Sequence, residues 1–203
     1  MTIEVPGQDE ISCCDAYHYG PFMKRISVGD IIERRVVETI QSSHIDVPHP
    51  TRLTHLQFRR FAGCPMCNLH IHSFVQRSNE LVALGIQEVA VFHSSKKAML
   101  EHHAAAPFAL IADPAKSLYM AFGVEPSIFS VLHPRSWLPL VQGLVRHGVS
   151  LPALGESPLG LPADFLIGRN GQVLACKYGN HAYDQWTVNE LLELAKHVEH
   201  TKH

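Results

Sequence analysis

The sequence lacks a long apolar segment and a strong charge of either sign. No run of about eighteen apolar residues occurs, so the sequence predicts no membrane-spanning helix and no membrane partner. The polar start MTIEVPGQDEISCC has no apolar core of signal-peptide length, and we therefore expect a cytoplasmic protein. The 17 Lys and Arg against 19 Asp and Glu leave a net charge of −2, which disfavours nucleic acid as a partner.

Cysteine is also scarce. The 5 cysteines are an odd number and too few for the disulfide framework of a secreted domain. In a reducing compartment such a set more often performs chemistry or binds metal than crosslinks a fold. Cys13 and Cys14 lie next to each other near the N-terminus, where an incidental pair is the simpler interpretation, and Cys176 fits a small core residue of a strand.

The hydrophobic pattern predicts one α/β domain. Short β-branched or apolar segments predict buried strands, and segments with apolar residues three and four apart predict helices. Residues 1–25 are expected to form an irregular arm, and 26–203 the domain, with a proline-rich insertion at about 125–160 before the last hairpin. The expected strands are 36–45, 53–61, 88–93, 108–112 and the hairpin 163–178; the expected helices are 65–85, 96–103, 114–122, 134–146 and 188–198.

Turn and cap signals fix several of these boundaries. Asp113 and Pro114 are typical of a helix start, and Thr187 with Glu190 forms a capping box before the last helix. Pro139 is expected to interrupt the helix of the insertion or to delay its start. The buried sheet would then carry helices on both faces.

The motif Cys64-Pro65-Met66-Cys67 follows a predicted strand and opens a predicted helix. Cys64 would be the cap residue, with Pro65 at the first helical position. The free N–H groups and the positive end of the helix dipole stabilise a thiolate there, so the pKa of Cys64 is expected to be low. Cys67 lies nearly one turn later, where it can attack a sulfur bound to Cys64, and the pair can cycle between dithiol and disulfide.

A zinc site is the alternative at this motif. The run continues from Cys67 to His70 and His72, and these residue types ligate zinc. A single helix cannot direct all four side chains to one point, because His72 lies on a different face from Cys67. We therefore expect no metal and no other cofactor, because sulfur carries both electrons in a redox cycle.

Five segments together resemble the peroxiredoxin-like branch of the alkyl hydroperoxide reductase/thiol-specific antioxidant (AhpC/TSA) family. They are FRRFAGCPMC, the following helix, EVAVFHSS, FALIADPAKSLYMAFGV and LPADFLIGRNGQVLACKYG, and the resemblance spans roughly residues 28–198. It implies a thioredoxin-like fold, with a central mixed sheet, helices on both faces and an insertion before the last hairpin.

The resemblance also implies roles for residues around the motif. Pro162 matches the proline that thioredoxin-fold proteins hold in the cis form beside the active cysteines, which would expose the backbone of Leu161 to substrate. An ordinary loop proline is an equally good interpretation of the sequence alone. Pro65 and Met66, between the cysteines, would shape the helix start and contact substrate.

The family implies that Cys64 is the nucleophile and Cys67 the resolving cysteine. The Pro-x-x-x-Thr/Ser-x-x-Cys motif of typical peroxiredoxins is absent. With Cys67 at its cysteine position, Arg60 and Cys64 occupy the Pro and Thr positions; with Cys64 there, Gln57 and Phe61 do. The arginine that binds peroxide is likewise left open among Arg59, Arg60 and Arg135.

The sequence therefore predicts a thiol–disulfide oxidoreductase or peroxiredoxin-like antioxidant protein. Its substrate would be a peroxide or a disulfide, and an external thiol system such as thioredoxin or glutathione would reduce it. The insertion would cover the site or form the face of a homodimer. The alternative is a non-enzymatic redox sensor, or a zinc-binding module, on the same fold.

Overall fold

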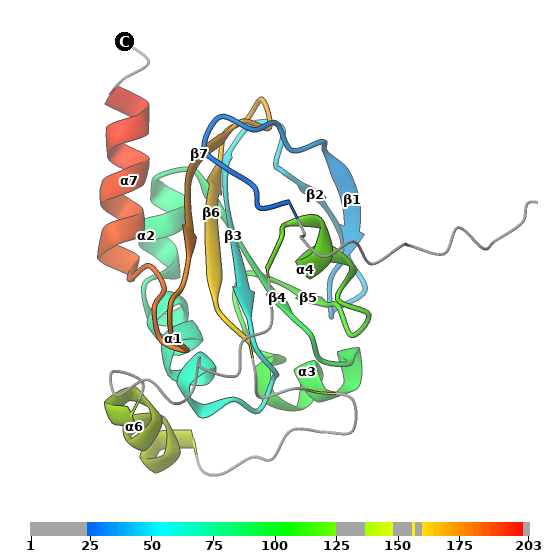
Figure 1. The fold of residues 1–203 in the computed structure, drawn as a ribbon, viewed down its shortest axis with the longest axis vertical. Coiled ribbons are helices and arrows are strands. Elements are labelled where there is room, and N and C mark those ends of the chain that lie inside the picture. The colour runs from blue at the N-terminus through cyan, green and yellow to red at the C-terminus, as the bar shows by residue number, and fades with distance from the viewer. Residues whose placement is uncertain (1–23, 125–136, 148–155, 157–159, 201–203) are drawn as a thin grey trace, which may run out of the picture.

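A five-stranded mixed sheet forms the centre of the computed structural model, which describes residues 24–124, 137–147, 156 and 160–200 (Figure 1). The strand order is β5-β4-β3-β6-β7. β3 and β5 run parallel to β4, whereas β6 runs antiparallel to both β3 and β7. The strands are β3 Leu53–Arg59, β4 Ile86–Phe92, β5 Ala109–Ala112, β6 Ala163–Ile167 and β7 Val173–Tyr178.

Helices cover both faces of this sheet, as the sequence predicts (Figure 1). Four helices pack on one face: α1 Pro65–Gln76, α2 Ser78–Ala83, α3 Lys96–His103 and α7 Val188–His200. The other face is covered by helix α4 Ser117–Ala121 and by the hairpin of β1 Arg35–Glu38 and β2 His44–Val47. The chain therefore has the predicted α/β architecture.

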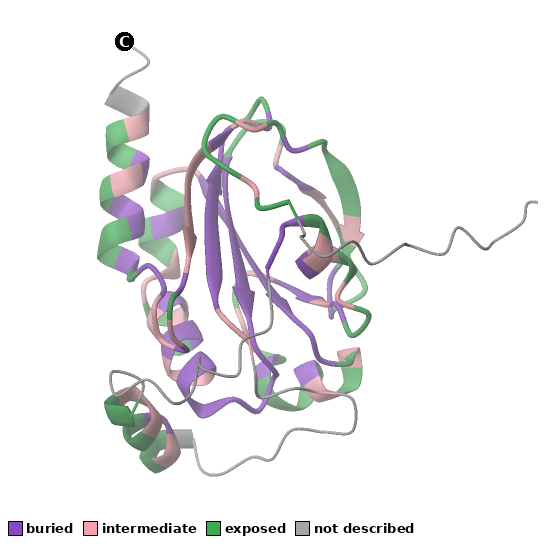
Figure 2. Ribbon diagram, viewed as in Figure 1, coloured by how far each residue is buried: buried purple, intermediate pink, exposed green. Residues whose placement is uncertain are grey.

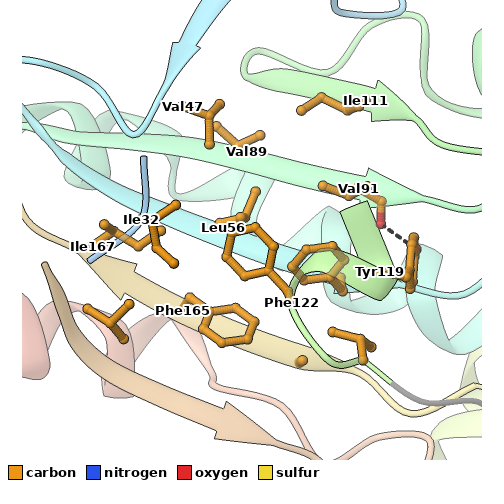
Figure 3. Close-up of a cluster of buried hydrophobic side chains, with 14 residues drawn as sticks. Ile32, Val47, Leu56, Val89, Val91, Ile111, Tyr119, Phe122, Phe165 and Ile167 are labelled. Carbon is orange, nitrogen blue, oxygen red and sulfur yellow. Dashed lines mark hydrogen bonds between the residues drawn. The ribbon is translucent and has the colours of Figure 1, made fainter. Parts of the chain in front are cut away.

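The core beneath α4 explains why the central strands are apolar on the face that α4 covers. Leu56 of β3 points to this side together with Phe165 of β6 (Figure 3), and Phe58 of β3 belongs to the same apolar cluster. Phe58 meets the ring of Tyr119 edge-on at 5.0 Å. Every residue of β3 is buried, so its side chains fill the core beneath α4 and that beneath α1 and α7 alternately.

Two predicted elements are each split in two. The segment 36–45 is a hairpin rather than one strand, because the chain reverses at Ser42, whose φ is +62°. The helix after the cysteine motif begins at Pro65 and is interrupted at Arg77, whose backbone at φ −115° and ψ 18° is not helical, and α2 begins at Ser78. In both places a local change of the backbone interrupts an apolar pattern that continues across it.

The cap at Asp113 also differs from the expectation. Pro114 does not open the helix, which starts only at Ser117 after the left-handed Lys116. The carboxylate of Asp113 instead accepts hydrogen bonds from the N–H groups of Ser117 and Leu118, at 3.0 and 2.8 Å. Asp113 therefore caps α4 from four residues upstream.

The final helix and the insertion helix follow the predictions more closely. The Thr187 hydroxyl accepts from the Glu190 N–H at 3.2 Å, and Glu190 accepts from the Thr187 N–H at 2.7 Å, which completes the predicted capping box. Helix α6 spans Trp137–His147, so Pro139 lies in its first turn, where proline is tolerated. Residues 134–136 of the expected helix lie outside the described part. None of the helices in the described ranges combines the length and the apolar character needed to span a bilayer.

Candidate redox site

The cysteine motif lies where β3 passes into α1, and its local structure is the predicted one. Cys64 is the N-cap residue of α1, with an extended backbone at φ −64° and ψ 116°, and Pro65 occupies the first helical turn. The Sγ of Cys64 accepts a hydrogen bond from the Cys67 N–H at 3.3 Å. The start of the helix thus directs a backbone donor at the first sulfur and brings the two cysteines together.

Arg60 supplies a positive charge to this site. It lies in the loop between β3 and α1, and its Nη2 donates to the Sγ of Cys64 at 2.9 Å. Arg60 is buried, with 4% of its surface exposed, so water screens its charge little. The sequence leaves the arginine that would bind peroxide open among three candidates. In the structure one of them, Arg60, lies beside the thiols. The signal available in the sequence was a second arginine directly after a strand that ends in Arg59.

The two thiols share one negative charge. Burial opposes ionisation, but the hydrogen bond from Cys64 and the charge of Arg60 lower the pKa of Cys67 to about 6. Burial, together with the hydrogen bond to Cys67 and its charge, raises the pKa of Cys64. The first proton is therefore lost from the pair near pH 6, and Cys64 keeps the second. This differs from the expectation of a low pKa at Cys64 itself.

A network of buried charges lies beneath α1. The ring of His55 on β3 lies between two carboxylates, 2.7 Å from Glu88 and 3.4 Å from Asp164. Asp164 also accepts from Arg59 at 2.6 Å, and Arg59 Nη2 lies 2.9 Å from Nε2 of His70 on α1. These side chains join strands β3, β4 and β6 to the cysteine helix. Side chains alternate between the two faces of a strand, so His55, Gln57 and Arg59 of β3 lie on the same face. This spacing of polar residues is visible in the sequence and is the signal that could have predicted the network.

This network makes the stability of the protein depend on pH. Burial opposes the protonation of His55, but Glu88 and Asp164 outweigh it and raise the pKa of His55 to about 9. The stabilisation is complete below the unfolded-state pKa of about 6.5 and is lost as the pH rises through about 9. We expect the free energy of unfolding to fall by about 3 kcal/mol over that range.

Urea unfolding at pH 7.5 and at pH 9.5 measures about 2 kcal/mol of this loss. Below pH 7.5 the lowered pKa values of His70 and His93 also change the stability, in the opposite direction. The variant carrying both Cys64→Ser and Cys67→Ser is the appropriate protein, because the low pKa of Cys67 stabilises the fold increasingly between pH 6 and 9 and so opposes the His55 effect. A free energy of unfolding that stayed constant or rose in this variant would show that His55 is not held as a cation.

The geometry argues against the zinc alternative. His70 is buried and directs Nε2 at Arg59 rather than at the cysteines, while His72 is exposed. Across residues 24–124, 137–147, 156 and 160–200, no three His, Cys, Asp or Glu side chains converge as metal ligands would. Cys13 and Cys14 lie outside the described residues, and Cys176 is half-buried in β7.

The loop before β6 lies beside the site, and of the two interpretations of Pro162 the cis proline that the resemblance implies is not the one found. Within the described part of the chain, the only cis peptide bond joins Val47 and Pro48, so the Leu161–Pro162 bond is trans. The carbonyl of Pro162 accepts from the Gly179 N–H at 2.9 Å, which ties the loop to the end of β7. A Cβ at Gly160 would lie 3.4 Å from Cγ of Arg60, so this loop contacts the buried arginine. Leu161 and Pro162 therefore stay candidates for substrate contact by position alone.

Several solved structures of other proteins superpose on this fold. The peroxidoxin BcpB of Mycobacterium tuberculosis superposes with a TM-score of 0.58 at 12% identity, covering 86% of this chain and 99% of its own. Peroxiredoxin 6 of Arenicola marina gives a TM-score of 0.62 at 14% identity, covering 87% and 75%. A protein of Chlorobium tepidum assigned as the thiol:disulfide interchange protein DsbE gives 0.54 at 18% identity, covering 84% and 99%.

The chain therefore has the thioredoxin-like fold of the peroxiredoxins, with the mixed sheet and two helical layers that the sequence predicts. No protein-family model and no curated protein matches the sequence significantly. At identities of 12 to 18% the likeness concerns the fold, and the chemistry has to be argued from the site.

Proposed function

We propose that the protein is a thiol-dependent oxidoreductase that cycles Cys64 and Cys67 between dithiol and disulfide. The observation that carries the proposal is the buried Arg60 guanidinium, 2.9 Å from the Cys64 sulfur at the N-terminus of α1. A buried positive charge beside two thiols favours one thiolate at neutral pH, and the thiolate is the reactive form of cysteine. A solely structural cysteine pair has no need of a buried cation.

The same pair can react with a disulfide. In our proposal the Cys64 sulfur attacks one sulfur of the substrate as its proton passes to the Cys67 thiolate, and the other substrate sulfur leaves as a thiol or thiolate. Cys67 then attacks the sulfur of Cys64, which forms the internal disulfide and releases the second substrate thiol. Two electrons pass from the protein to the substrate. An external thiol reductant, such as a thioredoxin or glutathione system, returns them.

A peroxide is the second candidate substrate, and the peroxiredoxin neighbours favour it. The Cys64 sulfur would attack one peroxide oxygen, break the O–O bond and become a sulfenic acid, while the other oxygen leaves as an alcohol or water. Cys67 would then displace water from that sulfenic acid and form the same disulfide. The proline and hydroxyl of the typical peroxiredoxin motif are absent, so we expect reaction with peroxide to be slower than disulfide exchange.

Turnover with a dithiol reductant tests the function and its substrate. The reduced protein is supplied with excess dithiothreitol and with either hydrogen peroxide or a small-molecule disulfide. The rate at which each substrate is consumed is then compared with the rate for the variant Cys176→Ser and with the rate in buffer alone. We expect catalytic consumption above buffer, faster for the disulfide, and unchanged by Cys176→Ser. A single oxidation without turnover would instead indicate a redox sensor, and no oxidation at all would overturn the proposal.

A further inference from the structure

The two cysteines are closed off from solvent. Only 1% of the surface of Cys64 and 3% of that of Cys67 is exposed. A nucleophilic sulfur must meet its substrate in line with the bond that breaks, which needs contact between the reacting atoms. The arrangement in the structure therefore holds the pair unreactive, and part of the surrounding packing has to move before either proposed substrate can reach it.

Helix α6 is the element that lies over the start of α1 (Figure 1). Gly143 packs against Pro65, the residue between Cys64 and Met66: a Cβ at Gly143 would lie 2.6 Å from the Pro65 carbonyl oxygen and 3.0 Å from its Cβ. Leu140, one turn earlier on α6, packs against the apolar cluster that contains Cys64 and Cys67. The two helices therefore touch backbone to backbone directly beside the cysteines.

Helix α6 packs closely on one partner, α1, but leaves much of its own apolar surface exposed. Among its residues 137–146 only Gly143 is buried, and most of the helix is coloured as exposed or intermediate in Figure 2. The exposed fractions are 62% for Trp137, 67% for Leu138, 56% for Val141 and 81% for Val145. Since hydrophobic stabilisation scales with the apolar area removed from water, α6 is held less firmly than helices such as α1 and α7.

We propose that α6 is a displaceable cover of the Cys64–Cys67 pair, and that Gly143 sets its closed position. In the closed state the thiols are unreactive, and they react only in the fraction of molecules in which α6 has moved away from Pro65. Glycine costs helix stability relative to alanine, and the close approach to Pro65 gives a reason for its presence in α6. The inference deepens the proposed function, because it concerns control of access to the same pair.

The substitution Gly143→Ala tests the cover. Its Cβ would meet backbone atoms of Pro65 that cannot move aside without shifting α1, so α6 must lift, while alanine keeps α6 helical. We expect Cys64 and Cys67 of the reduced protein to react with a neutral alkylating reagent roughly tenfold faster at pH 7 than in the unsubstituted protein. Peptide mapping by mass spectrometry gives the rate for each cysteine.

Two further variants and one internal reference keep the test decisive. Gln142→Ala changes the neighbouring exposed position and should leave the rates unchanged, whereas Leu140→Ala removes a contact with the cysteine cluster without any clash and should also raise them. Cys176 of β7 packs against the apolar cluster on the other face of the sheet from Cys64 and Cys67, and it reports general loosening of the fold. Unchanged rates at Cys64 and Cys67 in both Gly143→Ala and Leu140→Ala, or a rise matched at Cys176, would overturn the proposal.

This experiment is independent of turnover. It follows alkylation of the reduced protein and requires neither a substrate nor a reductant. A protein that failed the turnover assay could still show the Gly143 effect, and one that turned over could fail to show it. The failure of one proposal is therefore distinguishable from the failure of the other.

Discussion

Cys67→Ser is expected to stop the reaction halfway, and Cys64→Ser to prevent it from starting. Without Cys67, no neighbouring thiolate accepts the Cys64 proton, but Arg60 still lies 2.9 Å from the Cys64 sulfur and favours its thiolate. That thiolate attacks a disulfide, nothing resolves the product, and a mixed disulfide accumulates on Cys64. Without Cys64, no such adduct forms at that position. Turnover should fall by roughly a thousandfold or more in both variants, because the two sulfurs act as one unit.

Intact mass and peptide mapping after treatment with a small disulfide measure this difference. Cys176→Ser is the control, and it should retain turnover because Cys176 packs against a different apolar cluster from the one that contains Cys64 and Cys67. The low pKa of Cys67 would also suit a nucleophile. If Cys67 were the residue that attacks the substrate, the adduct would accumulate on Cys67 in the variant Cys64→Ser. That outcome would reverse the two roles proposed here.

Arg60→Gln is expected to slow the reaction of the thiols at pH 7 by about tenfold. Removing an opposite charge a few ångströms from a thiolate raises its pKa by about 1 to 3 units. The pKa of Cys67, about 6 in the unsubstituted protein, would then lie at or above neutrality. The rate of alkylation against pH should therefore rise around pH 6 in the unsubstituted protein and at clearly higher pH in the variant.

Arg77→Gln provides the matched control. Arg77 lies at the end of α1, where its guanidinium pairs with Glu80 and Asn189 rather than with a cysteine. In Arg77→Gln the alkylation rate of Cys64 and Cys67 should rise at the same pH as in the unsubstituted protein. Thermal unfolding of Arg60→Gln distinguishes a change of pKa from a loosened fold. An identical pH profile in a folded Arg60→Gln protein would show that the guanidinium does not stabilise the thiolate.

The sequence was sufficient for the fold because its local signals agree with one another. The alternation and apolar content of 53–61 and 163–178, the turn at Asn170 and Gly171 and the capping box at Thr187 each specify one element of the sheet or of its helical layer. The cap position of Cys64 followed from the order strand, cysteine, proline, helix. These are interactions between residues close in the chain.

The features that escaped prediction depend on residues far apart in the chain. His55 meets Asp164 across more than a hundred residues, and the peptide bond before Pro162 is set by the loop around it rather than by its neighbours in sequence. The contact of Gly143 with Pro65 is of the same kind. The sharing of one proton by Cys64 and Cys67 depends on how Arg60 packs against both, which the spacing of the motif does not contain.

The proposed function requires that Cys64 and Cys67 form a reversible disulfide with each other. To test this, the fully reduced protein is treated with one equivalent of a small-molecule disulfide and quenched with an alkylating agent, and its mass is measured before and after digestion. We expect the loss of two hydrogens, a bond mapped to Cys64 and Cys67, and full recovery of both thiols with dithiothreitol. Two alkylatable thiols remaining at these positions, or a bond that joins either of them to a different cysteine, would contradict it.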